Sequence, residues 1–141
     1  MSFVKYIKKL TSWLEKKGWI IQFDAIGNDF IDIDEKTVHI NQRTSPEKQL
    51  YCLLHECGHI LVGQNKQQFA QNFPIQAQID LKPNKNTEHS LKYKIDCLGE
   101  EYEAWKRGKR LAKRLDLAIN DNIFENVKTE CLKTYIDWCY E

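Results

Sequence analysis

The sequence lacks any long apolar run and any clear excess of charge of one sign. Its longest purely apolar stretches are short, such as Trp19–Ile21 and Ile60–Val62, whereas a helix that spans a bilayer needs about 18–20 apolar residues. The 21 Lys and Arg residues are balanced by 20 Asp and Glu residues, which leaves a formal charge of +1. These absences exclude a transmembrane protein, and no overall field draws the chain to nucleic acid or to an acidic membrane.

The sequence also lacks paired cysteines and a secretory signal. Five cysteines is an odd number, and none of them forms a C-x-x-C pair, which argues against a disulfide framework. The N-terminal residues MSFVKYIKKLTSW interleave lysines with apolar residues, whereas a secretory signal has a continuous apolar segment. We therefore expect reduced thiols, most of them in the core, and a cytoplasmic protein.

Length and periodicity predict a single α+β domain over residues 1–141. With 42% hydrophobic residues the chain can bury one core, and no internal repeat or domain boundary is visible. Apolar residues at helical spacing predict an amphipathic helix over residues 3–17, which ends at Gly18. Three short runs rich in β-forming residues then predict a small antiparallel three-stranded sheet, with strands at residues 19–24, 29–34 and 37–41.

The second half of the chain is predicted to be mainly helical. Thr44-Ser45-Pro46-Glu47 is a strong helix start, and its helix should run to about residue 62. Two more amphipathic helices are expected, one over about residues 98–115 and one after Asn120. Residues 64–96 are rich in Gln and Asn and show little sustained period, which predicts a polar connection or flap with one short element near Ile75–Leu81.

The strongest chemical signal is His55-Glu56-Cys57-Gly58-His59, which matches the H-E-x-x-H pattern late in a capped helix. A spacing of four residues brings His55 and His59 onto one helix face, close enough to bind one tetrahedral zinc ion. Glu56 points to the side of this pair, so it could reach water at the metal as a general base. Gly58 costs about 1 kcal/mol in mid-helix, which favours a close approach of another backbone.

A zinc site of this kind needs a third protein ligand. The metzincin pattern requires Gly at position 62 and His at position 65, where this chain has Val62 and Asn65, so that class is excluded. On the later helix, Glu101 lies about 15° from the centre of the apolar face and Glu100 about 85° from it. A carboxylate on an apolar face is costly unless it is paired or bound to metal. We therefore predict Glu101 as the third ligand, with Glu100 or His89 as alternatives.

Two segments resemble the ImmA/IrrE family of metallo-endopeptidases, especially members carried by phages and other mobile elements. They are INQRTSPEKQLYCLLHECGHILVG, residues 40–63, and EEYEAWKRGKRLA, residues 100–112. The resemblance implies a small sheet before the active-site helix and a gluzincin-like zinc site. It assigns His55, His59 and Glu101 as zinc ligands and Glu56 as the catalytic base. It further implies a protein substrate, such as a repressor-like regulator of a mobile element.

The prediction is therefore a zinc-dependent endopeptidase that cleaves a protein or peptide substrate. The substrate could add as a strand to an exposed sheet edge at Thr37–Asn41. A Tyr, His or Arg should stabilise the oxyanion; Tyr93, Tyr102 and His89 are near in sequence, and the pattern does not choose among them.

Two other functions remain open. A SprT-like DNA-associated metalloprotease would use His89 as a ligand and the basic stretch Lys106–Arg114 as its nucleic-acid face. A non-catalytic zinc-containing interaction module would bind a partner without cutting it. The intact Glu56 argues against this module, because zinc binding alone does not require a base there.

Overall fold

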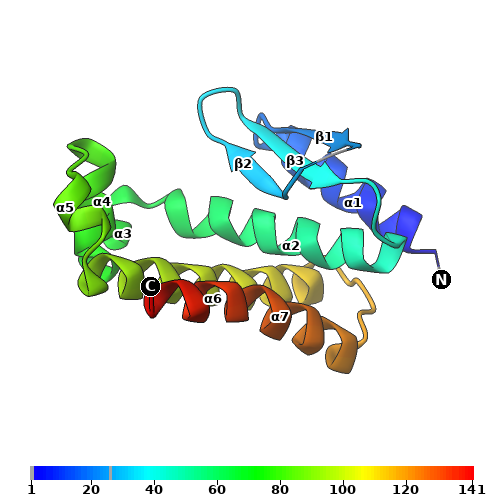
Figure 1. The fold of residues 1–141 in the computed structure, drawn as a ribbon. Coiled ribbons are helices and arrows are strands. Elements are labelled where there is room, and N and C mark those ends of the chain that lie inside the picture. Colours follow the sequence, from blue (N-terminus) through cyan, green and yellow to red (C-terminus); the bar gives the residue numbers. More distant parts are fainter. Residues whose placement is uncertain (1, 26) are drawn as a thin grey trace.

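The computed structural model describes residues 2–25 and 27–141. Helix α2 (Pro46–Gly63) runs through the middle of the molecule. The sheet and helix α1 (Phe3–Lys16) cover one side of it, and helices α6 (Leu91–Arg114) and α7 (Asp121–Cys139) cover the other (Figure 1). This arrangement confirms the α+β fold class, with the H-E-x-x-H helix at its centre.

Helix α1 forms as its sequence predicts. Tyr6, Ile7, Leu10 and Leu14 are its buried residues, and they follow the three- and four-residue spacing of one helix face. The chain turns after the C-cap Lys17 at Gly18, whose φ of 85° lies in the left-handed region where glycine carries no Cβ penalty.

The sheet is mixed, so the prediction of a purely antiparallel sheet is wrong. Strands β1 (Ile20–Asp24) and β2 (Phe30–Asp32) both pair with β3 (Thr37–Asn41), in the order β1-β3-β2. β2 and β3 form an antiparallel hairpin, whereas β1 runs parallel to β3. The physical reason is burial: Val38 and Ile40 on β3 are almost fully buried, so β3 takes the central position above α2.

This order changes which edge is free. Thr37–Asn41 has a neighbouring strand on both sides and cannot accept a further one. The prediction that a substrate strand adds to this segment is therefore also wrong. β2 lies at an edge of the sheet instead.

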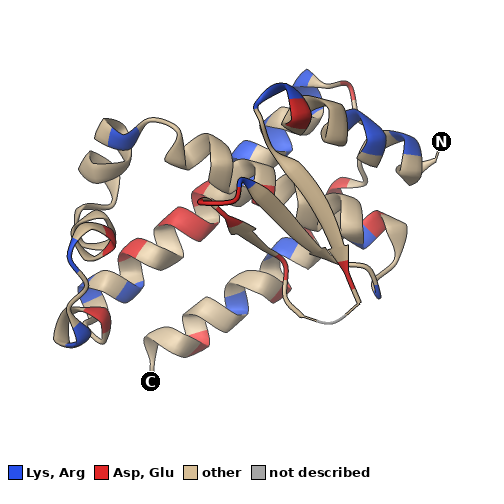
Figure 2. Cartoon of the chain, turned by 90° about the horizontal axis from the view of Figure 1, so that it is seen from above, with Lys and Arg blue, Asp and Glu red and all other residues tan. Residues whose placement is uncertain are grey.

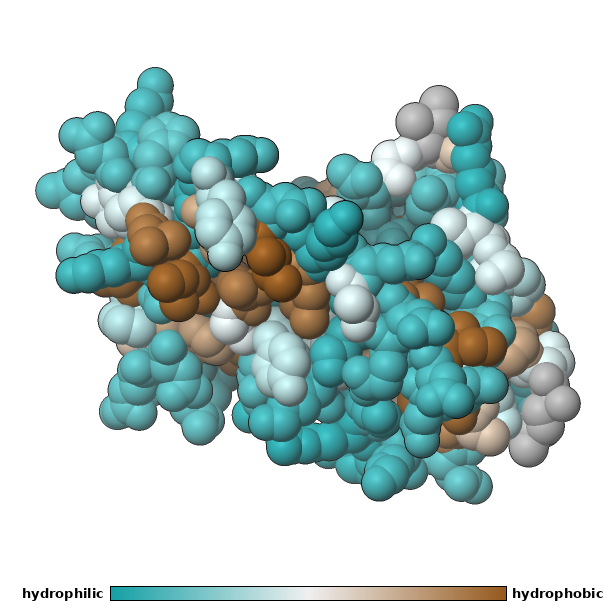
Figure 3. Space-filling model, turned by 60° about the horizontal axis from the view of Figure 1, so that its bottom comes forward, coloured by the Kyte–Doolittle hydropathy of each residue, from teal (hydrophilic) through white to brown (hydrophobic). Residues whose placement is uncertain are grey.

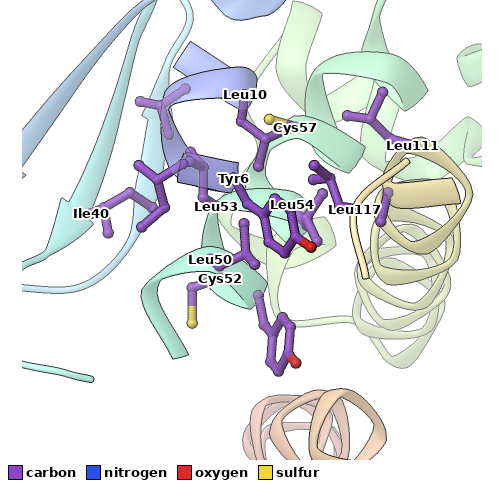
Figure 4. Packing of buried hydrophobic residues seen from close by; sticks show 14 of the residues in the cluster. Tyr6, Leu10, Ile40, Leu50, Cys52, Leu53, Leu54, Cys57, Leu111 and Leu117 are labelled. Carbon is purple, nitrogen blue, oxygen red and sulfur yellow. The ribbon is translucent and has the colours of Figure 1, made fainter. Parts of the chain in front are cut away.

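Helix α2 begins and packs as expected. The Ser45 side chain accepts a hydrogen bond from the Lys48 N–H at 3.3 Å, with Pro46 in the first turn. Most of the helix is buried, because apolar layers contact it from both sides. Figure 4 shows Leu53 and Leu54 of α2 packed between Leu10 of α1 and Leu111 of α6.

The segment 64–96 is largely helical. The prediction of a long connection with one short element is therefore wrong, because it underestimated how much of the segment is helical. It forms α3 (Lys66–Asn72), α4 (Pro74–Leu81), α5 (Lys85–Glu88) and the first turn of α6. The Asn65 side chain caps α3, and Phe73 and Ile79 are buried. These few apolar anchors, spread among Gln and Asn, are too sparse to produce a clear sequence period. The expected element near Ile75–Leu81 corresponds to α4.

The surface carries separate charged and apolar regions. Figure 2 shows Lys and Arg along α1 and Asp and Glu on the middle of α6. Within Lys106–Arg114, Lys106, Arg107 and Lys109 form ion pairs with neighbouring carboxylates. Apolar side chains gather on the face formed by α6 and α7 (Figure 3). No helix in the described part of the chain is long and apolar enough to cross a membrane.

Candidate metal centre

His55 and His59 lie one turn apart on α2 and point toward α6. Their ring centroids are 4.5 Å apart, as the i, i+4 spacing on one helix face requires. Both side chains are only 11% exposed. The two imidazoles therefore sit together at the interface between the two central helices.

Glu101 on α6 completes a three-residue cluster. Its carboxylate oxygens lie 2.8 Å from His55 Nε2 and 3.1 Å from His59 Nε2. Ligand atoms of His55, His59 and Glu101 all lie within 4.8 Å of one another, and no other group of this kind occurs in residues 2–25 and 27–141. Two imidazole nitrogens and a carboxylate oxygen are the donor set of a catalytic zinc site, which keeps a further position open for water.

Glu100 also faces the cluster, although the helical period placed it about 85° from the apolar face. Its Oε2 lies 2.6 Å from His59 Nδ1, and its side chain is only 13% exposed. Glu100 and Glu101 thus lie at opposite nitrogens of the His59 ring. A carboxylate on the distal nitrogen of a ligating histidine fixes its tautomer and orientation.

Trp105 orients the other imidazole. Its fully buried ring stacks on His55 at 4.3 Å between centroids and 7° between planes. The Phe124 ring packs edge-on against Trp105 from α7. Aromatic packing of this kind holds the His55 ring plane in one direction. The sequence alone gives no sign of this contact, because the register between α2 and α6 is not encoded locally.

Two glycines allow the histidine helix and the glutamate helix to approach closely. A Cβ at Gly58 would overlap the backbone carbonyl of Ala104, and a Cβ at Gly108 would overlap that of Leu54. This confirms the expected close backbone approach at Gly58. It brings His59 within reach of a short carboxylate side chain on α6.

The electrostatics of the metal-free cluster favour a cation. Burial lowers the pKa of His55. Burial also disfavours the charged form of His59, but its bonds to Glu100 and Glu101 outweigh this and raise the pKa of His59 well above its usual value. Burial likewise opposes ionisation of Glu101, yet hydrogen bonds from both histidines hold its pKa well below the usual range. A divalent cation could take the place of the His59 proton between these groups.

Glu56 lies beside this cluster and is only 4% exposed. Its Oε1 is 3.5 Å from His55 Nδ1, so it does not bridge the two histidines as Glu101 does. Burial raises the pKa of Glu56 to about 8. A carboxylate with a raised pKa next to a metal site has the basicity that proton transfer near neutral pH requires.

The cluster opens into a cavity of about 1390 Å³. Its walls come from β2, from α3 and α4, and from α7, in addition to α2 and α6. Phe30, Ile33 and Leu81 are large apolar residues on these walls and are exposed. The volume of the cavity exceeds the roughly 300–1,000 Å³ of an ordinary small-molecule pocket, so it has room for a peptide segment.

The other sequence candidates lie elsewhere. His89 is the exposed C-cap of α5 and is not part of the cluster. The remaining histidine, His39, pairs with Asp24 at 2.8 Å and stacks on Phe30. Neither Tyr93 nor Tyr102 lines the cavity, whereas Tyr135 of α7 does. The sequence alone gave Tyr135 no functional role.

Comparison with known families adds one finding. A family model described as IrrE N-terminal-like domain matches residues 19–89, which is just over half of the chain. The match spans the sheet, α2 and both histidines, and it ends before α6 and Glu101. No curated protein and no solved structure matches the chain.

Proposed function

The chain belongs to the ImmA/IrrE metallopeptidase family, and on this premise we propose that it is a zinc-dependent endopeptidase. The observation that carries the proposal is the convergence of His55 Nε2 and His59 Nε2 on the Glu101 carboxylate, beside a buried Glu56. We propose His55, His59 and Glu101 as the zinc ligands. Bound zinc would polarise the scissile carbonyl and make water more acidic.

The protein groups have separate tasks in the proposed reaction. Glu56 accepts one proton from the attacking water and passes it to the nitrogen of the scissile bond as the C–N bond breaks. Glu100 keeps the proton of His59 on Nδ1, so that Nε2 carries the lone pair. Trp105 keeps the His55 ring in its plane and excludes water from that side.

The substrate would lie along β2. This strand has a free edge, and Phe30, Ile31 and Ile33 line the cavity that contains the histidines. An extended peptide added to a free edge gains main-chain hydrogen bonds, and its side chains contact the apolar walls. We infer a protein substrate with an extended segment that carries large apolar side chains. By family resemblance, a repressor-like regulator of a mobile element such as a phage is a candidate.

The two other functions have less support. A SprT-like protease with His89 as a ligand would need that side chain at the cluster, from which it is absent. Lys106, Arg107 and Lys109 also form ion pairs with carboxylates, which neutralise part of the basic face that would bind nucleic acid. A non-catalytic zinc module gives no reason for a buried carboxylate at Glu56, whose isolation from water is costly.

The test compares wild type with Glu56→Gln, and uses Glu103→Gln as a matched control on the outer face of α6. We expect one zinc per chain in all three proteins. Cleavage of a broad peptide library should fall by about 10²–10⁴-fold only in Glu56→Gln, because an amide cannot accept the proton. Equal cleavage by Glu56→Gln and wild type would contradict the mechanism. Cleavage that requires added DNA would instead favour the SprT-like function.

A further inference from the structure

Tyr135 lines the candidate catalytic cavity from α7. Glu101, one of the candidate ligands, lines the same cavity, and a phenol O–H can donate a hydrogen bond to an oxygen there. Glu56 reaches the same cavity from α2. The base and the phenol therefore reach the cavity of the three candidate ligands from two different helices.

The side chain of Tyr135 is held in position by its own helix. Its ring packs edge-on against Trp138, and Trp138 also meets Tyr93 of α6 edge-on. The buried Lys94 lies 5.3 Å from the Trp138 ring centroid and donates hydrogen bonds to the carbonyls of Trp138 and Glu141. These contacts tie the last turn of α7 to α6. A donor held in this way needs little reorganisation during a reaction.

We propose that Tyr135 is a catalytic residue that donates a hydrogen bond to the oxyanion formed during peptide hydrolysis. The inference rests on the proposed function, and it adds a residue from a helix beyond the family match. Water oxygen forms a bond to the carbonyl carbon, and the carbonyl π electrons move to its oxygen. Tyr135 donates to this oxygen and keeps its proton. The C–N bond then breaks, and the amine leaves with the proton carried by Glu56.

The other candidate donors do not compete for this task. Tyr102 follows Glu101 directly but is 48% exposed, and Lys128 covers its ring outside the cavity. Tyr93 packs on Trp138 and is not among the residues that line the cavity. Arg107 is paired with Glu103 at 3.1 Å. Of the tyrosines in the described residues, Tyr135 alone lines the cavity.

The experiment compares Tyr135→Phe with Tyr102→Phe, the same chemical change one residue from the ligand but outside the cavity. Three quantities are measured on zinc-loaded protein: kcat and KM on a cleaved peptide, zinc affinity by chelator competition, and affinity for a phosphinic peptide that imitates the tetrahedral state. In Tyr135→Phe we expect kcat to fall by about 10²–10³-fold with KM unchanged. Phosphinic-peptide affinity should fall as well, while zinc affinity stays within about twofold of wild type. Tyr102→Phe should match wild type throughout.

Two results would overturn the inference. If Tyr135→Phe binds zinc at least tenfold more weakly and regains full kcat at saturating zinc, Tyr135 only orients Glu101. If wild type and Tyr135→Phe bind the phosphinic peptide equally, Tyr135 does not contact the tetrahedral state, whether or not the protein cleaves peptides. Failure of the proposed function has a different signature, namely zinc-loaded wild type that cleaves no peptide in the library.

Discussion

The backbone of Gly58 on α2 contacts the carbonyl group of Ala104 on α6 so closely that no side chain fits between them. Gly58 directly precedes His59, and Ala104 follows Glu101 by three residues, so this contact lies next to the candidate metal site. The approach of the two backbones lets His59 and Glu101 meet at 3.1 Å. The close packing of α2 and α6 at Gly58 and Ala104 thus also sets the geometry of the candidate metal site.

Gly58→Ala should destabilise the protein by about 1–3 kcal/mol or more, because the added methyl forces the helices apart. This loss opposes the gain of about 1 kcal/mol that alanine normally brings to a helix. Gly63→Ala is the control, since a Cβ there meets nothing within 4 Å. Urea unfolding of both variants measures the difference. Equal stability of Gly58→Ala and wild type would show that the helices can separate at no cost.

The two glutamates at the cluster should affect zinc affinity to different degrees. Glu101→Ala removes one of the three proposed protein ligands, so we expect protein purified without added metal to lose its zinc. Glu100→Gln leaves the ligands intact but weakens the hold on His59, which typically costs 10–100-fold in metal affinity. Glu103→Ala and His89→Ala should bind zinc as wild type does. Chelator competition measures all four, and loss of zinc from His89→Ala would point to a different third ligand.

The free edge at β2 predicts where substrate binds. Ile33→Asp should raise KM about tenfold with zinc content unchanged, because a charge replaces apolar contact area on the cavity wall. Ile33 is 70% exposed, so the change should leave the fold intact. The matched control is Ile20→Asp on β1, an exposed position outside the cavity. If both variants change KM alike, the substrate does not use the β2 wall in particular.

Residues 64–96 contain both structural and exposed apolar side chains. Phe73→Ala should lower stability by about 3–5 kcal/mol, because its ring is buried and lies where a Cβ at Gly99 of α6 would come within 3.4 Å of it. Leu81→Ala should change stability by less than about 0.5 kcal/mol, since Leu81 is 89% exposed. Hydrogen exchange gives an independent measure: slow exchange at 73–79 indicates a fixed wall, and fast exchange there indicates a mobile flap.

Tyr51 predicts how stability depends on alkaline pH. Its hydroxyl donates to Glu47 at 2.7 Å and accepts from the Asn120 N–H at 2.9 Å. Burial raises the pKa of Tyr51 to about 12 from the model-compound value of 10.0. The folded state therefore keeps a proton that the unfolded chain loses, so this stabilising contribution is complete below pH 10 and declines as the pH rises toward 12.

The corresponding variant is Tyr51→Phe. It should be less stable than wild type at pH 7 by about 1–3 kcal/mol, because the Asn120 N–H loses its partner. It should also lose less stability than wild type between pH 9 and pH 11, measured as urea midpoints at each pH. A decline as steep as that of wild type would mean that Tyr51 titrates normally in the fold.

The local sequence determined the elements whose signals lie within a few residues. The Ser45 cap, the turn at Gly18 and the i, i+4 pair His55 and His59 follow from backbone geometry and side-chain spacing alone. The helical period also singled out Glu101, because an acid on an apolar face needs a partner. Sequence patterns therefore predicted the helix that carries the motif and the residues that meet on it.

Only the tertiary structure decided how distant elements combine. Strand order depends on which strand α2 can bury most fully, so β3 became central and β2 became the edge, which no local pattern specifies. The register of α6 against α2 turned Glu100 toward His59 and stacked Trp105 on His55. The packing of α7 brought Tyr135 into the cavity from more than thirty residues beyond Glu101. Such contacts arise from burial and close packing between segments far apart in the chain, which the periodicity of any one segment cannot encode.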